Sequence, residues 1–160
     1  MRAIRAVVMV LLIAGVVSAS RGVRAQETGD PLLGTWQMDA SKSKFSPGPP
    51  PKSITINFEQ AAQGIKASSD VVQADGKSTH TEFTASYDGK DVPLTGSPIA
   101  DSVSVQKVGD TRVRKDKKNG KVIMTYTGTI STDGKTFSVQ QKGTNQDGVA
   151  VSNVVVFQKQ

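Results

Sequence analysis

The stretch KVIMTYTGTISTDGKTFSVQQKGTNQDGVAVSNVVVF, residues 121–157, decides the fold. Apolar and hydroxylic residues alternate through its first ten positions, a pattern that places one face of a β-strand on a core. Asp-Gly pairs at 133–134 and 147–148 separate each alternating run from the next. Asp-Gly favours a tight turn in which both central residues have positive φ, and such turns join twisted antiparallel strands. The stretch therefore predicts three consecutive strands in a meander.

The same pattern runs through most of the chain before residue 121. Asp-Gly also occurs at 75–76 and 88–89, again between alternating runs. Chance would supply roughly one such pair in this composition, so four of them indicate successive hairpins. No stretch has the period of an amphipathic helix. We predict an all-β protein, an antiparallel up-and-down barrel of about eight to nine strands, a size that holds side chains or one small ligand.

The first 25 residues are expected to be a secretory signal peptide. Arg2 and Arg5 precede an uncharged apolar run at 6–17, and small residues follow, which is the layout of such a signal. The run is shorter than the about 20 residues that a membrane-spanning helix needs. Cleavage after Ala25 is favoured over cleavage after Ala19.

Residues 26–160 are expected to form a single exported domain, periplasmic or extracellular. The chain has no cysteine, which excludes disulfides and thiolate metal sites. Loss of residues 1–25 removes four arginines and leaves 16 basic and 14 acidic residues, a net charge of +2. Because the high isoelectric point belongs partly to the removed segment, nucleic-acid binding is not predicted.

A Gly-x-Trp motif opens the folded part at Gly34-Thr35-Trp36. With the hairpin array that follows, it resembles the lipocalin and fatty-acid-binding superfamily, in particular small exported lipocalin-like proteins of bacteria. The resemblance implies a closed barrel whose interior accepts an apolar small molecule. Two features depart from it: the Thr-Asp-Tyr signature of lipocalins does not occur, and Val155 and Phe157 stand where fatty-acid-binding proteins have Arg-x-Tyr. A fatty-acid carboxylate would therefore lack a guanidinium partner there.

Inward-facing aromatic residues are the candidate ligand-binding residues. The alternation places most of them on one inner face, and the resemblance adds the tryptophan at the barrel end. The set is Trp36, Phe58, Phe83, Tyr126, Phe137 and Phe157. In small barrels such residues also simply fill the core, and this alternative stays open. The proline-rich segment at 46–51 is expected to cross one end of the barrel, with Phe45 beside the mouth.

No constellation of residues indicates catalysis. His80, the single histidine, is expected on the outer face beside Glu82, and no nucleophile is recognisable near it. One histidine without cysteine does not make a zinc site. We therefore expect neither enzymatic activity, nor a metal, nor a cofactor.

A basic cluster and an apolar run are the remaining surface features. The cluster consists of Arg112, Arg114, Lys115, Lys117, Lys118 and Lys121. It suits a weak contact with an anionic surface, although a solvated hairpin protected from edge pairing is the favoured interpretation. Residues 154–157 are apolar on both faces, and we expect Leu32 and Leu33 to cover the outer one, with a partner chain as the alternative.

Two functions are compatible with these observations. The first is an exported, non-enzymatic barrel that binds or carries a small apolar molecule. The second is a barrel with a filled interior that acts through its surface, as an envelope protein-interaction module or an inhibitor of a secreted enzyme.

Overall fold

A computed structural model describes residues 29–145 and 147–160. The predicted signal peptide at 1–25 lies outside these residues, so export and the cleavage site stay predictions. The strands are β1 Gly34–Met38, β2 Ser53–Ala61, β3 Gly64–Val72, β4 Ser78–Ala85, β5 Asp88–Pro93, β6 Ser102–Val108, β7 Thr111–Lys118, β8 Lys121–Ile130, β9 Thr136–Thr144 and β10 Ala150–Lys159. Within the described ranges, no helix has the length and apolarity needed to cross a membrane.

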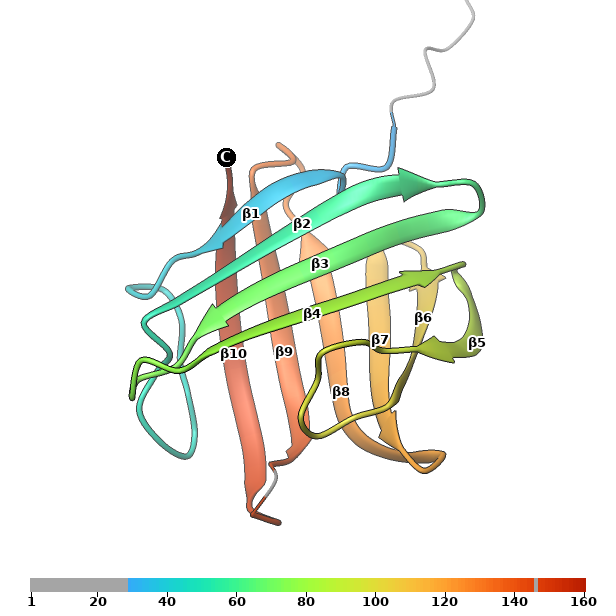
Figure 1. The fold of residues 1–160 in the computed structure, drawn as a ribbon. Coiled ribbons are helices and arrows are strands. Elements are labelled where there is room, and N and C mark those ends of the chain that lie inside the picture. Colours follow the sequence, from blue (N-terminus) through green and yellow to red (C-terminus); the bar gives the residue numbers. More distant parts are fainter. Residues whose placement is uncertain (1–28, 146) are drawn as a thin grey trace, which may run out of the picture.

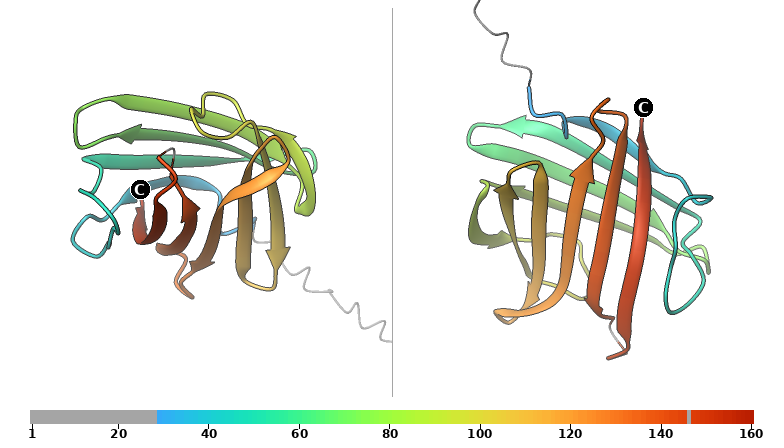
Figure 2. Two further views of the ribbon diagram at one scale, coloured as in Figure 1. Left: turned by 90° about the horizontal axis from the view of Figure 1, so that it is seen from below. Right: turned by 180° about the vertical axis from the view of Figure 1, so that it is seen from behind.

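The ten strands form one antiparallel sheet that curls into a near-closed barrel. Their order is β4-β3-β2-β1-β10-β9-β8-β7-β6-β5, so the first strand, β1, pairs with the last strand, β10. In Figure 1, β2, β3 and β4 cross in front of β7 to β10 at a steep angle, and Figure 2 shows the two layers from below and behind. The predicted all-β antiparallel barrel is confirmed, with a slightly higher strand count.

The extra strand is β5, which lies at the open edge of the barrel. Pro93 and Pro98 predict a loop or an edge strand over residues 91–100, and Asp88–Pro93 is an edge strand that pairs with β6 through a bulge. A proline is tolerated because β5 uses only one of its edges. Closure toward β4 depends on two backbone hydrogen bonds, Glu82 N to Thr95 O at 3.1 Å and Thr95 N to Glu82 O at 2.9 Å.

The turn chemistry differs from the prediction. At Asp133-Gly134 only the glycine has positive φ, 70°, and the aspartate carboxylate instead accepts a hydrogen bond from Lys135 N at 3.0 Å. Asn119-Gly120, between β7 and β8, is the turn in which both residues have positive φ, 50° and 76°. Asp75, Asp88 and Asp133 thus mark their turns through a side-chain hydrogen bond to the residue two positions on, whereas at Asp147-Gly148 the acceptor is Asn145 Oδ1.

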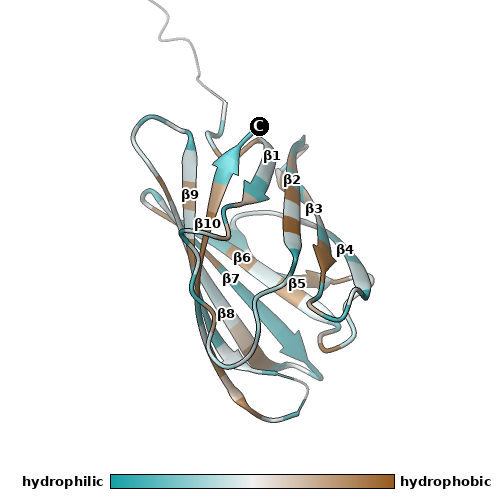
Figure 3. Cartoon of the chain, turned by 90° about the vertical axis from the view of Figure 1, so that its left-hand side faces the viewer, coloured by the Kyte–Doolittle hydropathy of each residue, from teal (hydrophilic) through white to brown (hydrophobic). Residues whose placement is uncertain are grey.

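The core lies between the two layers of the barrel. Figure 3 shows hydrophobic and hydrophilic bands alternating along β2, β9 and β10, as expected for strands with one buried face. Phe137 is central: its ring centroid lies 5.6 Å from that of Trp36, 6.2 Å from Phe58 and 6.0 Å from Phe157. Gly128 on β8 leaves room for that ring, because a Cβ there would overlap the edge of Phe137.

Residues 39–46 continue β1 along the edge of β10. Backbone hydrogen bonds join Lys44 and Val154 in both directions, and Ser43 Oγ accepts one from Val156 N at 3.0 Å. The expected cover of the outer face by Leu32 and Leu33 is wrong, because both pack against the core, where Leu32 is almost fully buried. Val154 on that outer face is 39% exposed.

Candidate functional site

The basic cluster divides between the inside and the outside of the barrel. Strand β7 lies between β6 and β8, so it is not an edge hairpin, and its alternation turns Arg112 and Arg114 inward together with Asp116. Lys117 and Lys118 remain outside, where they pair with Asp91 and Asp101. The interpretation of this cluster as one solvated surface is therefore wrong for its two arginines.

The guanidinium of Arg114 is stacked between two aromatic rings. Its central carbon lies 4.8 Å from the ring centroid of Phe83 on β4 and 4.9 Å from that of Tyr126 on β8. Arg114 and Tyr126 are directly paired in the sheet, whereas Phe83 reaches across from the opposite layer. The stack therefore holds the plane of the guanidinium between the two layers.

Asp116 neutralises this arginine on one edge. Arg114 Nε donates to Asp116 Oδ1 at 2.7 Å and Nη2 donates to Oδ2 at 2.9 Å, a bidentate pair. Only 3% of Asp116 is exposed. Burial alone would lower the pKa of Arg114, but the charge of Asp116, the nearby Tyr126 and the hydrogen bonds to Asp116 together outweigh it and raise that pKa. Burial and the same carboxylate raise the pKa of the Tyr126 hydroxyl, so the phenol stays neutral.

A small cavity of about 70 Å³ lies against this stack. Aliphatic and aromatic side chains make most of its wall, and the two inward arginines supply its charged part. The lining consists of Leu32, Ile56, Phe58, Ile65, Phe83, Val105, Arg112, Arg114, Tyr126, Phe137 and Val139. Four of the predicted ligand-binding residues, Phe58, Phe83, Tyr126 and Phe137, thus meet at one space. Trp36 and Phe157 are buried in the core but do not line this cavity.

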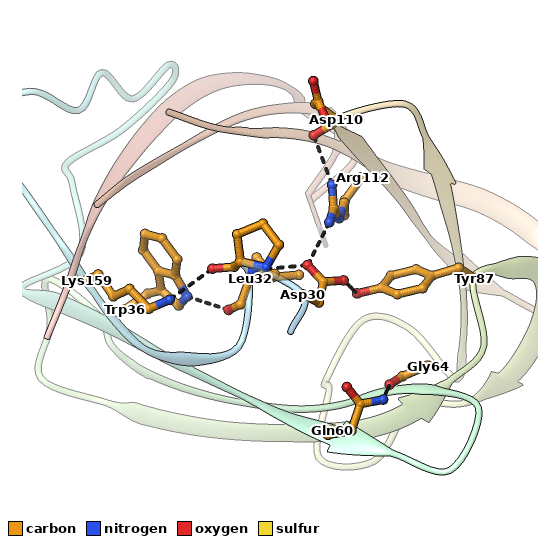
Figure 4. Close-up of polar contacts among 10 residues, drawn as sticks. Asp30, Leu32, Trp36, Gln60, Gly64, Tyr87, Asp110, Arg112 and Lys159 are labelled. Carbon is orange, nitrogen blue, oxygen red and sulfur yellow. Dashed lines mark hydrogen bonds and ion pairs between the residues drawn. The ribbon is translucent and has the colours of Figure 1, made fainter. Parts of the chain in front are cut away.

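A polar network closes the barrel end above the cavity (Figure 4). Asp30 accepts hydrogen bonds from Arg112 Nη2 at 2.6 Å, from the Tyr87 hydroxyl at 2.6 Å and from Leu32 N at 3.0 Å. Burial alone would raise the pKa of Asp30, yet these bonds and the charge of Arg112 lower it below its ordinary value. Asp30 therefore fixes the segment that carries Leu32 into the barrel.

The tryptophan secures the same segment. Trp36 Nε1 donates to Leu32 O at 2.7 Å, and Lys159 Nζ donates to Pro31 O at 2.9 Å. Trp36 is fully buried, as expected for a residue at one end of the barrel. Residues 30–33, which we call the end plug, are consequently held by β1, β7 and β10.

Arg112 separates the inner cavity from a second pocket. The outer pocket measures about 270 Å³ and is lined by Pro31, Lys107, Asp110, Arg112, Ile130, Ser131, Thr132 and Gly134. Arg112 also donates from Nη1 to Asp110 O at 3.0 Å. Its buried Nε has no hydrogen-bond partner among the described residues. The end plug and Arg112 together form the partition between the two spaces.

His80 lies apart from this interior site, on the exposed face of β4. Its Nδ1 is 2.7 Å from Asp70 Oδ1, and its Nε2 is 3.6 Å from Glu82 Oε1. The hydrogen bond to Asp70 raises the pKa of His80. This surface pair agrees with the expected outward position. In the described part of the chain, no three His, Cys, Asp or Glu residues are grouped to hold a metal ion.

Sequence reasoning missed the interior charges although the signal was present. Arg112, Arg114 and Asp116 are spaced by two residues and therefore share one face of β7. Val103 and Val105 on the neighbouring strand are apolar and buried, and they pair with Asp116 and Arg114. The register of the β6–β7 hairpin therefore indicates that these charged residues face inward, although the number of basic residues suggested a solvated surface.

Comparison of the sequence with known family models and with curated proteins yields no match. Solved structures do share the shape. Rv2717c from M. tuberculosis is 14% identical with a TM-score of 0.51, and the match covers 81% of this chain and 93% of that one. Zebrafish ileal bile acid-binding protein complexed with cholic acid is 13% identical, with a TM-score of 0.47 and coverage of 81% and 99%. The siderocalin Ex-FABP is 9% identical, with a TM-score of 0.38 and coverage of 81% and 74%. At 14% identity, the likeness to Rv2717c concerns the fold.

Proposed function

We propose that this protein is a non-enzymatic barrel that binds a small, mostly apolar molecule in its interior. The observation that supports the proposal is the cavity between the two layers, whose wall combines Phe58, Phe83 and Phe137 with the stacked guanidinium of Arg114. An apolar wall with few polar groups is typical of small-molecule sites. Apolar burial supplies affinity, and the polar group orients the ligand.

The size of the cavity restricts the ligand. Sites for drug-sized molecules have volumes of about 300 to 1,000 Å³, well above the 70 Å³ here. A dry engineered cavity of about 150 Å³ holds benzene. The bound molecule therefore has few heavy atoms, or it displaces Leu32 and opens the interior toward the outer pocket.

Native mass spectrometry tests the proposal directly. The purified protein is incubated with a lipid and metabolite extract, and we expect an adduct that is lost in the Phe83→Arg variant, because the new cation would occupy the cavity wall. Val108→Arg adds the same side chain at an exposed position, where Val108 is 64% exposed, and should keep the adduct. An adduct retained by Phe83→Arg would place the ligand elsewhere and refute the interior site.

The limited volume also favours a second candidate function. A barrel whose interior is almost filled would act through its outer surface, as an envelope interaction module or an inhibitor of a secreted enzyme. Persistent absence of any adduct, together with specific capture of one envelope protein, would favour this alternative over ligand binding.

Export remains part of the proposal for both functions. The charged, apolar and small-residue layout of residues 1–25 supports it. Amino-terminal sequencing of the protein recovered from the cell envelope or medium should give Gln26 as the first residue. Recovery of the intact chain from the cytosol would refute export and leave the binding proposal unaffected.

A further inference from the structure

We propose that the interior site selects ligands with a neutral hydrogen-bond acceptor, such as a carbonyl or ether oxygen, and discriminates against carboxylates. The acceptor would lie at the free edge of the Arg114 guanidinium, with the apolar part of the ligand against the aromatic wall. This inference rests on the proposed binding function and specifies its ligand class.

Arg114 has hydrogen-bonding capacity that the described part of the chain does not use. Its Nε and one N–H of Nη2 are engaged by Asp116. Among the described residues, Nη1 has no acceptor, so its two N–H groups remain available to a ligand. About 24% of the side chain is still accessible, and the residue lines the cavity. A donor is therefore present in the cavity wall.

The guanidinium that carries this donor is held in a fixed position. Phe83 and Tyr126 sandwich the guanidinium, and Asp116 fixes it in its plane, so it cannot swing toward a ligand elsewhere. Such preorganisation reduces the entropy lost on binding. An acceptor must therefore approach in the plane of the guanidinium while its apolar part remains between the two layers.

Both inward arginines are already neutralised by buried carboxylates. Asp116 neutralises Arg114, and Asp30 neutralises Arg112, so each inward cation already has its own buried counter-ion. A ligand carboxylate would bring a further negative charge beside Asp116 and lose its hydration without meeting an uncompensated cation. A neutral oxygen accepts the same N–H groups at a much smaller desolvation cost.

The test compares three small ligands that share an ethyl tail and differ only in the group attached to it: butane, methyl ethyl ketone and propanoate. Each is titrated into the folded protein at neutral pH, and dissociation constants are measured from amide chemical shifts of cavity residues. We expect the ketone to bind at least about tenfold more tightly than propanoate, a difference of about 1.4 kcal/mol. The ketone should also bind more tightly than butane, because butane has no acceptor for Arg114.

Asp116→Asn provides the sharper version of the test. The variant keeps the shape of the side chain but leaves Arg114 without its counter-charge, so the affinity for propanoate should rise by more than the about tenfold difference expected in the wild type, and propanoate should overtake the ketone. Asp91→Asn removes the same charge outside the barrel, where Asp91 pairs with Lys117, and should leave the order unchanged. Circular dichroism verifies the fold of each variant, and the wild-type ratio decides the question by itself if Asp116→Asn does not fold.

The outcomes separate the inference from the function on which it rests. Propanoate binding as tightly as the ketone in the wild type, or butane matching the ketone, would overturn the head-group selectivity while ligand binding stands. An unchanged order in folded Asp116→Asn would overturn the role of Asp116. If none of the three ligands binds, the proposed function itself fails and the selectivity fails with it.

Discussion

Arg112 and Asp30 are separated by 82 positions in the chain, yet Arg112 Nη2 donates a hydrogen bond of 2.6 Å to Asp30 Oδ1 inside the barrel end. Their side chains are only 7% and 11% exposed. The pair fastens the end plug to the inner face of β7 and closes the space above the cavity. A buried ion pair of this kind is costly to disrupt from one side, because the remaining charge stays desolvated.

Asp30→Asn should therefore destabilise the protein by about 3 kcal/mol, since it leaves Arg112 charged and buried without a counter-ion. The measurement is the free energy of unfolding in urea. Asp110→Asn is the matched control: it removes a nearby carboxylate but keeps the backbone carbonyl that accepts from Arg112 Nη1. Equal unfolding free energies for the two variants would show that the ion pair contributes nothing beyond the packing of the plug.

The same pair predicts a dependence on pH. Hydrogen bonds from Tyr87 and Leu32 and the charge of Arg112 outweigh burial and lower the pKa of Asp30 below its ordinary value of 3.8. The folded protein therefore holds this proton more weakly than the unfolded chain does. The contribution of Asp30 is complete above about pH 5 and is lost as the pH falls through the lowered folded pKa.

Urea titrations of wild type and Asp30→Asn across the acid range would measure this contribution. The difference between their unfolding free energies should be constant from neutral pH down to about pH 5 and shrink below about pH 4. A difference that grows on acidification would contradict a lowered pKa, because it would mean that the folded protein binds the proton more tightly.

The sequence predicted the hairpins because their determinants are local. Alternation and turn glycines lie within a few residues of each other, and the structure reproduces the meander of β8, β9 and β10. For β5 the sequence left a loop and an edge strand open, because Pro93 excludes a central strand but is acceptable at an edge. Local rules therefore identified the elements but not their place in the sheet.

The interior polar groups were harder to predict, for two different reasons. For Arg114 and Asp116 the spacing was sufficient, but a run of basic residues in β7 suggested a solvated surface. For Asp30 no local signal exists, because Arg112 and Tyr87 become its neighbours only when β1, β5 and β7 are brought together. Contacts between residues so far apart in the sequence form only in the closed barrel, and the pattern within a single strand does not predict them.

Gly96 controls closure of the barrel edge. It has a φ of 77°, and a Cβ there would overlap the carbonyl oxygen of His80, so Gly96→Ala should push the neighbouring Thr95 away from Glu82. We expect faster amide exchange at Glu82 and Thr95, whose N–H groups form the two closing hydrogen bonds.

Gly109→Ala separates this overlap from backbone strain. Gly109 also has positive φ, 58°, but open space where a Cβ would stand, so only the conformational cost of about 1 kcal/mol applies. Gly96→Ala should cost at least about 2 kcal/mol more, since backbone atoms cannot move aside as a flexible side chain can. Similar losses for the two variants would show that the edge adapts and that the barrel closes without this contact.

Trp36 reports on the end plug because it is the single tryptophan and donates through Nε1 to Leu32 O. As a fully buried ring it should show blue-shifted fluorescence and weak quenching by acrylamide. In Asp30→Asn the plug loses its ion pair, and the weaker acceptor also loosens the bond from Leu32 N, so quenching should rise. In Asp110→Asn, acrylamide should quench the Trp36 fluorescence to the same extent as in the wild type. If acrylamide quenched Trp36 in Asp30→Asn no more than in the wild type, burial of Leu32 alone would be sufficient to hold the end plug. Ligands larger than the cavity would then have to enter between β4 and β5.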